Sequence, residues 1–247
     1  MIDLHCHILP GIDDGAPDLG VSLAMARMAL ADGIVTVACT PHIMRGVYNN
    51  SGADIRLRVA SLAAALETAG IPLTLTIGAD AHLDPSLLEG LRSGEIPTIG
   101  GSRYFLLEPP HHVAPPRLQD FTFGLMASGY VPVLTHPERF SWIDGQYDLI
   151  RRMAASGVLM QLTAGSVLGD FGRRAKYWAE RMLDENMADL LATDAHNVDS
   201  RPPRLAAARN AVAKRCGDAT GARLVAANPL AILQNVLSST IMIRRKD

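Results

Sequence analysis

Seven short runs of apolar residues recur along the chain, and segments with helical character lie between them. The runs are almost continuous in apolar residues, a pattern typical of strands buried on both faces of a parallel sheet. We expect strands over Ile2–His5, Ile34–Cys39, Leu73–Ile77, Tyr104–Glu108, Val131–Thr135, Val158–Leu162 and Asp189–Thr193. Alternating strands and helices imply parallel strands joined by right-handed crossovers. The sequence therefore predicts an α/β fold, a distorted (β/α)7 barrel of the TIM type, with an open doubly wound sheet as the alternative.

Several of the expected helices begin at a proline or end before a glycine, which are common helix boundaries. We expect helices over Pro17–Ala31, Ala53–Ala69, Arg117–Ser128, Tyr147–Ser156, Arg173–Asn186, Pro202–Gly217 and Pro229–Leu237. No repeat, low-complexity tract or linker divides the chain, and 247 residues is an ordinary length for one α/β barrel. We therefore predict a single domain over residues 1–247.

Charge and cysteine usage exclude several classes of function. A net charge of −2 argues against nucleic acid as a partner, because nucleic-acid-binding proteins usually carry a basic excess. No apolar run approaches the roughly 20 residues of a membrane span, and the first residues lack the pattern of a signal peptide. Three scattered cysteines suit a reducing compartment rather than a disulfide framework. We expect a cytoplasmic protein without membrane insertion.

Histidines and carboxylates follow the expected strands, at or just after the point where each strand ends. They are His5, His7, Asp14, His42, Asp80, Glu108, His136, Asp194 and His196. The carboxyl ends of parallel barrel strands open on one face, so these side chains are expected to converge there. Nitrogen and oxygen donors without thiolates suit Mn²⁺, Fe or Zn²⁺. Nine ligands exceed the needs of one ion, which implies two or three ions with bridging carboxylates. We leave His82, His111 and His112 outside the site.

A competing motif lies after the second expected strand. The segment from Cys39 to Arg45 matches the Cys-x5-Arg spacing of phosphatases that use a cysteine thiolate. A phosphate-binding loop needs freely oriented amides, usually supplied by glycine, whereas this loop contains Pro41 and no internal glycine. We therefore expect Cys39 to pack at the end of a buried strand.

Five motifs occur in the order and spacing of a known superfamily. They are MIDLHCHILPGIDDG at 1–15, TPH at 40–42, SRY at 102–104, HPER at 136–139 and TDAHN at 193–197, followed by RPP at 201–203. Together they resemble the PHP (polymerase and histidinol phosphatase) superfamily. Within it, the chain is most similar to the bacterial capsular and exopolysaccharide tyrosine-protein phosphatases. That resemblance spans nearly the whole chain and also implies the distorted barrel.

The resemblance implies a site with three metal ions, usually Mn²⁺. One ion would be held by His5, His7, Asp80 and Asp194, and Asp80 would bridge to a second ion completed by Glu108 and His136. Asp14, His42 and His196 would hold the third ion, and Arg139 would bind the phosphate. The family usually has glutamate at the position of Asp80. Aspartate is shorter by one methylene, so either the backbone lies closer to the metals or the bridge is asymmetric.

The function that follows is phosphomonoester hydrolysis by a metal-bridging hydroxide, with Arg139 on the phosphoryl oxygens. By resemblance, the substrate is a phosphotyrosine protein, expected to be the tail of an autophosphorylated bacterial tyrosine kinase in capsule or exopolysaccharide regulation. Arg45 and Arg201 are candidates for a second phosphate contact or for an acidic peptide. An oligomer is compatible with this function.

Three alternatives remain at this stage. One is a PHP phosphoesterase acting on a small-molecule phosphate, such as a histidinol phosphatase. The second is a metal amidohydrolase, which commonly uses a carbamylated lysine near the fourth strand. This chain has Glu108 there, and its three lysines, Lys176, Lys214 and Lys246, lie elsewhere. The third is a binding module that keeps the fold and a partial site.

Overall fold

Nine parallel-paired strands surround a central axis in the computed structural model, which describes residues 1–237. They are β1 (Ile2–Cys6), β2 (Thr36–Cys39), β3 (His42–Ile43), β4 (Thr74–Ile77), β5 (Asp80–His82), β6 (Tyr104–Glu108), β7 (Val131–Thr135), β8 (Leu159–Thr163) and β9 (Leu190–Ala192). All seven expected strands are present with small shifts at their ends. The two short strands β3 and β5 were not predicted.

The barrel has seven strand positions, here called staves, and two of them are each split into two strands. One sheet has the order β1-β2-β4 and the other β3-β5-β6-β7-β8-β9. The register continues across the break, because Thr36 lies opposite Thr74 and His42 lies opposite Asp80. Thus β3 extends β2 beyond Pro41, which has no N–H to donate to the ladder. In the same way β5 extends β4.

A β-bridge between Cys6 and Ala195 joins the first and last staves. Beside it, the Asp194 N–H donates to the His5 carbonyl over 2.8 Å. The chain therefore closes into a barrel of seven staves, as predicted, and the open doubly wound sheet is excluded.

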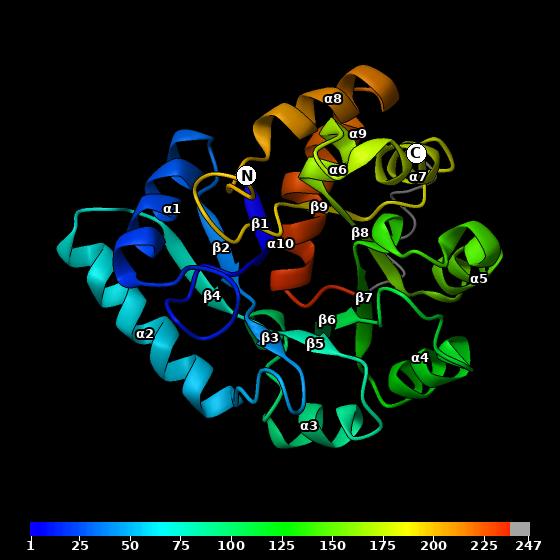
Figure 1. The fold of residues 1–247 in the computed structure, drawn as a ribbon, viewed down its shortest axis with the longest axis horizontal. Helices are drawn as coiled ribbons and strands as arrows, with labels where there is room; N and C mark the ends of the chain where they lie inside the picture. The colour runs from blue at the N-terminus through cyan, green and yellow to red at the C-terminus, as the bar shows by residue number, and fades with distance from the viewer. Residues whose placement is uncertain (238–247) are drawn as a thin grey trace.

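Helices lie around the strands, with α1 and α2 beside β1, β2 and β4, and α4, α5 and α7 on the side of β7 and β8 (Figure 1). They are α1 (Leu19–Ala31), α2 (Gly52–Thr68), α3 (Leu87–Ser93), α4 (Leu118–Ala127), α5 (Ile143–Ser156), α6 (Ala164–Leu168), α7 (Gly172–Asp184), α8 (Ala206–Cys216), α9 (Asp218–Ala222) and α10 (Asn228–Leu233). Short helical turns add Ile99–Gly101, Pro137–Arg139 and Arg223–Ala227. The sequence did not predict α3, α6 or α9.

Three helix boundaries differ by four residues from the prediction, and one of them is the start of α8, which was expected at Pro202 and lies at Ala206. The side chain of Asp32 accepts hydrogen bonds from the backbone N–H groups of Leu205 and Ala206, at 2.6 and 2.8 Å. A distant carboxylate thus satisfies the free amides at the helix start, a partner that no local pattern shows. None of the helices described in residues 1–237 is long and apolar enough to cross a lipid bilayer.

The barrel interior is filled by small and medium apolar side chains from the strands. The inner cluster includes Leu4, Ala38, Tyr104, Leu106, Val131, Val133, Leu159 and Leu190. Ala231 and Ile232 of α10 belong to the same cluster, so the C-terminal helix closes one end of the barrel. The other end carries the polar side chains that follow the strands. The last ten residues of the predicted domain lie outside the described part of the chain.

A β-bulge in β1 changes the direction of one functional side chain. Asp3 lies opposite Val37 and Cys6 opposite Cys39, so β1 has one more residue than β2 between these pairs. Leu4 packs in the inner cluster, whereas Cys6 packs in the larger outer cluster. In a regular strand His5 would face away from the side of Leu4, whereas the extra residue lets His5 face the barrel interior as Leu4 does, because a bulge redirects side chains along a strand.

Candidate metal centre

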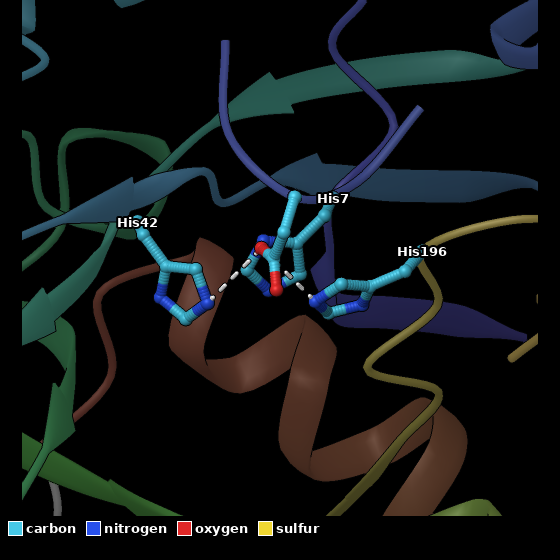
Figure 2. Close-up of side chains that lie close together, drawn as sticks. His7, His42 and His196 are labelled. Carbon is cyan, nitrogen blue, oxygen red and sulfur yellow. Dashed lines mark ion pairs between the residues drawn. The ribbon is translucent and has the colours of Figure 1, made fainter. Parts of the chain in front are cut away.

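Histidines from three staves meet at the carboxyl ends of the strands. Figure 2 shows the imidazoles of His7, His42 and His196 pointing toward one another from the residue after β1, from β3 and from the segment after β9. Asp14 lies among them, with its Oδ1 3.5 Å from both His42 Nε2 and His196 Nε2. One donor atom from each of these four side chains lies within 4.8 Å of the others.

A second group forms around His5 Nε2. This atom lies 3.2 Å from His7 Nε2, 3.3 Å from Asp194 Oδ1 and 3.4 Å from Asp80 Oδ2. These four side chains are the set expected for the first ion. All four are almost fully buried. The structure therefore brings the predicted residues together at the distances that neighbouring ligands of one ion require.

Asp80 lies between two groups. Its Oδ2 is 3.4 Å from His5 Nε2 and 3.5 Å from His42 Nδ1, and His42 Nδ1 lies 3.3 Å from Glu108 Oε2. The pairing of β3 with β5 places Asp80 directly opposite His42. The shorter aspartate thus reaches the position between the first and second groups because its backbone belongs to a strand at the edge of the cluster.

Glu108 connects the remaining histidines. Its Oε1 lies 3.6 Å from His136 Nε2 and 3.2 Å from His111 Nε2. Its Oε2 lies 3.7 Å from His82 Nδ1. The expectation that His111 stands apart is therefore not met, because His111 forms a close group with Glu108 and His136, whereas His82 and His112 contribute to none of the close groups in the described chain. The spacing of His111, three residues after a strand-end glutamate, was the available signal.

Hydrogen bonds orient three of the imidazoles. His5 Nδ1 lies 2.8 Å from Gln161 Oε1, His7 Nδ1 lies 2.7 Å from Asp13 Oδ2, and His196 Nδ1 lies 2.9 Å from the Asp194 carbonyl. An acceptor at Nδ1 places the proton there and leaves the Nε2 lone pair free for a cation. In each case that Nε2 faces the cluster. Asp13 and Gln161 are supporting residues that the sequence analysis did not identify.

Charge controls the protonation of the cluster. Burial disfavours charged His5, but the carboxylates of Asp194 and Asp80 outweigh burial and raise its pKa to about 9. Burial also opposes charging of His42, and Glu108 and Asp80 raise its pKa to about 10. By contrast, burial and neighbouring His7 lower the pKa of His196 to about 4. The carboxylates thus create a site that attracts positive charge.

The donor set fits divalent metal ions. Both carboxylate oxygens of Asp80 and the Nε2 of His196 are buried and make no hydrogen bond within residues 1–237. Buried polar atoms without partners are costly, and bound ions commonly satisfy them. Nitrogen and oxygen donors suit Mn²⁺, Fe or Zn²⁺. The cysteines nearest the site do not contribute, because Cys6 and Cys39 pack in the outer apolar cluster and neither belongs to a close donor group in residues 1–237.

Two of these residues have an unusual backbone conformation. His136 has a φ of 36° and Asp194 a φ of 51°, both in the left-handed region that non-glycine residues rarely occupy. Such conformations cost free energy and are concentrated at functional sites. They turn the chain one residue after β7 and two residues after β9, at the end of the barrel where the cluster lies.

Two arginines approach the same carboxylate. Arg139 Nη1 and Arg201 Nη2 each donate to Asp194 Oδ2 over 2.5 Å. The ring of Phe171 lies against both guanidinium groups, with Cζ-to-centroid distances of 4.3 Å for Arg139 and 5.8 Å for Arg201. Cation–π contact of this kind holds a guanidinium in place. The structure therefore places two of the three predicted arginines beside the cluster, and Phe171 was not predicted.

Arg45 lies elsewhere. It is 75% exposed, donates to Ser86 Oγ over 3.0 Å and lines a cavity of about 280 Å³ beside α3. Cys39 is fully buried in the outer cluster and its thiol remains protonated. An exposed arginine and a buried thiol do not form a phosphate loop, so the geometry contradicts the Cys-x5-Arg alternative.

Comparison with known proteins gives a consistent result. The family model described as "Capsular polysaccharide synthesis, CpsB/CapC" matches residues 1–234. The tyrosine-protein phosphatase YwqE of Bacillus subtilis is 36% identical over 201 residues, covering 81% of this chain and 79% of YwqE. The putative tyrosine-protein phosphatase CapC of Staphylococcus aureus is 32% identical over 202 residues, covering 82% of this chain and 79% of CapC.

Solved structures show the same relationship. One from a study of YwqE from Bacillus subtilis and CpsB from Streptococcus pneumoniae, described there as metal-dependent tyrosine phosphatases, superposes with a TM-score of 0.92. It is 33% identical, and the match covers 96% of both chains. An organophosphorus hydrolase from Deinococcus radiodurans matches with a TM-score of 0.58 and 16% identity over 94% of this chain and 92% of its own. That likeness concerns the barrel fold alone.

Proposed function

This chain belongs to the CpsB/CapC family, and from this premise we propose that it is a metal-dependent protein-tyrosine phosphatase. The observation that carries the proposal is the convergence of nine metal-capable side chains beside two arginines at one end of the barrel. Hydrolysis of a phosphomonoester requires an activated water and neutralisation of the phosphoryl oxygens. The nine side chains supply ligands for metal ions that would activate the water, and the two arginines supply positive charge for the phosphoryl oxygens.

We propose three metal positions held by this chain's residues. The first uses His5, His7, Asp80 and Asp194, the second uses Asp80, Glu108 and His136, and the third uses Asp14, His42 and His196. The short distance between His42 Nδ1 and Glu108 Oε2, 3.3 Å, supports a contribution of His42 to the second position as well. Bound divalent ions lower the pKa of coordinated water towards about 7 and neutralise phosphoryl charge. Mn²⁺ is the proposed ion.

Arg139 and Arg201 are proposed to bind the phosphoryl group. The planar guanidinium groups can each donate two parallel hydrogen bonds to phosphoryl oxygens. Both already lie at Asp194, so the bound phosphoryl group would sit between the arginines and the ligand cluster. Phe171 keeps the two side chains on that side of the cluster. The leaving phenol has a pKa of about 10, so a phenolate departs with less protonation than an alkoxide needs.

The proposed physiological substrate is the phosphorylated tyrosine tail of a bacterial tyrosine kinase, in the cytoplasm. The relatives named above support the phosphotyrosine part of this proposal. Arg45, in its separate cavity, is proposed to contact the substrate polypeptide rather than the reacting phosphoryl group, because it is bound to Ser86 and near Asp84.

Two of the alternatives lose support from the geometry. The described lysines, Lys176 in α7 and Lys214 in α8, lie on helices, and Glu108 occupies the position where an amidohydrolase would carry its modified lysine. The convergence of all nine predicted ligands argues against a non-catalytic module with a partial site.

A substrate comparison tests the proposed function against the small-molecule alternative. Purified protein with Mn²⁺ is assayed on a phosphotyrosine peptide, on p-nitrophenyl phosphate and on histidinol phosphate. We expect the two aryl phosphates to be hydrolysed with the higher kcat/KM. A clear preference for histidinol phosphate would instead favour the small-molecule phosphoesterase, and no hydrolysis of any of the three would contradict both.

A further inference from the structure

A cavity of about 360 Å³ opens beside the ligand cluster, on the side of His42 and Glu108. Those two side chains line it together with His82, His111 and His112, and its apolar lining comes from Met44, Tyr48, Pro110 and Val113. We call this space the aryl cavity. Its apolar lining comes from two loops, one after β3 and one after β6, and the ends of β3, β5 and β6 supply His42, His82 and Glu108.

One side chain of the aryl cavity, Tyr48, is positioned by a proposed metal ligand. The Tyr48 ring stacks on the His42 ring, with centroids 5.5 Å apart and planes inclined by 16°. Val113 lies in the other loop and is 68% exposed, which is unusual for a valine that serves only packing. One aromatic face and one uncovered apolar side chain therefore border an opening that leads to Glu108 and His42.

The position of this cavity selects the group that it can bind. A group held there lies next to His42 and Glu108, two of the nine proposed metal ligands. A second cavity, of about 520 Å³ beside Arg201 and Phe171, includes none of the nine proposed ligands in its lining. Flat apolar groups gain affinity by burial and by offset stacking on an aromatic face. The aryl cavity offers both, directly adjoining the site.

We infer that the aryl cavity holds the phenyl ring of the substrate phosphotyrosine and makes the enzyme prefer aryl over alkyl phosphomonoesters. The inference rests on the proposed function and adds the residues that select the substrate class. A phosphotyrosine ring would contact Tyr48 and Val113, whereas the shorter side chain of phosphoserine would leave both uncovered. Burial of the phenyl ring would therefore favour phosphotyrosine over phosphoserine without changing how the phosphoryl group binds.

Val113→Ser tests the inference, with Val35→Ser as the matched control. Val35 is also an exposed valine, at 53%, but it precedes β2 at the opposite end of the barrel, where its N–H donates to the Met1 carbonyl. For each protein, kcat/KM is measured on p-nitrophenyl phosphate and on an alkyl phosphate, phosphoserine. Binding of phenylphosphonate and of inorganic phosphate is measured by calorimetry as a readout that requires no turnover.

For Val113→Ser we expect kcat/KM on the aryl phosphate to fall about fivefold and phenylphosphonate affinity to fall similarly, from the loss of part of one apolar contact. Phosphoserine hydrolysis and inorganic phosphate affinity should change less than twofold. Val113→Leu should restore the aryl preference, and Val35→Ser should match the wild type.

The possible outcomes distinguish a failure of the proposed function from a failure of the aryl cavity as the substrate-selecting site. If the wild type fails to hydrolyse the aryl phosphate with Mn²⁺, the proposed function is wrong. If the wild type is active but Val113→Ser lowers kcat/KM equally on both substrates, or on neither, the aryl cavity does not select the substrate. A changed sedimentation coefficient with unchanged aryl preference would assign the surface to a second copy of the chain and overturn the inference.

Discussion

The carboxylate of Asp13 holds His7 in place from outside the ligand cluster. Asp13 Oδ2 accepts a hydrogen bond from His7 Nδ1 over 2.7 Å and another from the backbone N–H of His42 over 3.0 Å. Its Oδ1 accepts from the Gly15 N–H over 2.9 Å. One carboxylate therefore links two proposed ligands that lie 35 positions apart on different staves. Partners of this kind fix the ring orientation and raise the basicity of a metal-binding histidine.

We predict that Asp13→Ala weakens metal binding about 10- to 100-fold, the usual cost of losing such a partner. Asp13→Asn, which keeps one acceptor oxygen, should lie between Asp13→Ala and the wild type. Metal affinity is measured by competition with a chelator, independently of turnover. Asp148→Ala is the matched control, because Asp148 is an exposed aspartate on α5. Equal metal affinities in Asp13→Ala and Asp148→Ala would show that Asp13 does not position His7.

Arg139 provides the second prediction. Arg139→Lys should lower kcat/KM on p-nitrophenyl phosphate about 100-fold, because an ammonium group cannot donate the two parallel hydrogen bonds of a guanidinium. The affinity for inorganic phosphate should fall as well, while metal content stays unchanged. Arg117→Lys, at a surface arginine that is 84% exposed, is the matched control. If Arg139→Lys keeps its phosphate affinity, Arg139 does not bind the phosphoryl group.

The buried thiol of Cys39 provides the third prediction. Burial raises its pKa, so the thiol stays protonated at pH 8 and is not a nucleophile. Iodoacetamide at that pH should leave Cys39 unmodified in the native protein and label it after unfolding, as mass spectrometry can show. Cys39→Ser should keep turnover within about twofold per folded molecule. Loss of turnover in Cys39→Ser protein that still binds metal would support the thiolate mechanism instead.

The fourth prediction concerns the helix that closes the barrel. Ile232 of α10 is fully buried in the inner cluster, whereas Leu230 of the same helix is 45% exposed. Ile232→Ala should lower the free energy of unfolding by about 3 kcal/mol, in the range for buried aliphatic truncation, and Leu230→Ala by less than about 1 kcal/mol. Urea denaturation measures both values. Similar losses for the two variants would mean that α10 does not seal the interior.

The strands and the predicted site were readable from the sequence for a specific physical reason. Parallel strands buried on both faces give continuous apolar runs, and their carboxyl ends share one face, so residues such as His136 and Asp194 could be assigned to one site. The two-residue strand β3 was not predicted, because so short an element carries no periodicity. Its existence depends on pairing with β5.

Residues that support the site were harder to predict, because their role depends on contacts between distant segments. Gln161 reaches His5 from β8, and Phe171 reaches two arginines from the segment before α7. Neither residue type indicates such a role without the fold. The bulge that redirects His5 is also a property of strand pairing, since the residues of β1 carry no local signal for it.

The central claim is that the nine converging side chains hold the metal ions on which phosphatase activity depends. It is tested most directly by removing metal with a chelator, titrating Mn²⁺ back and following bound ions per chain together with hydrolysis of p-nitrophenyl phosphate. We predict no turnover in the metal-free protein and recovery that parallels the binding of two or three ions. We also predict that, when Mn²⁺ is titrated back, the Asp194→Ala variant recovers neither turnover nor the full number of bound ions. Full turnover in protein shown to contain no metal would contradict the claim.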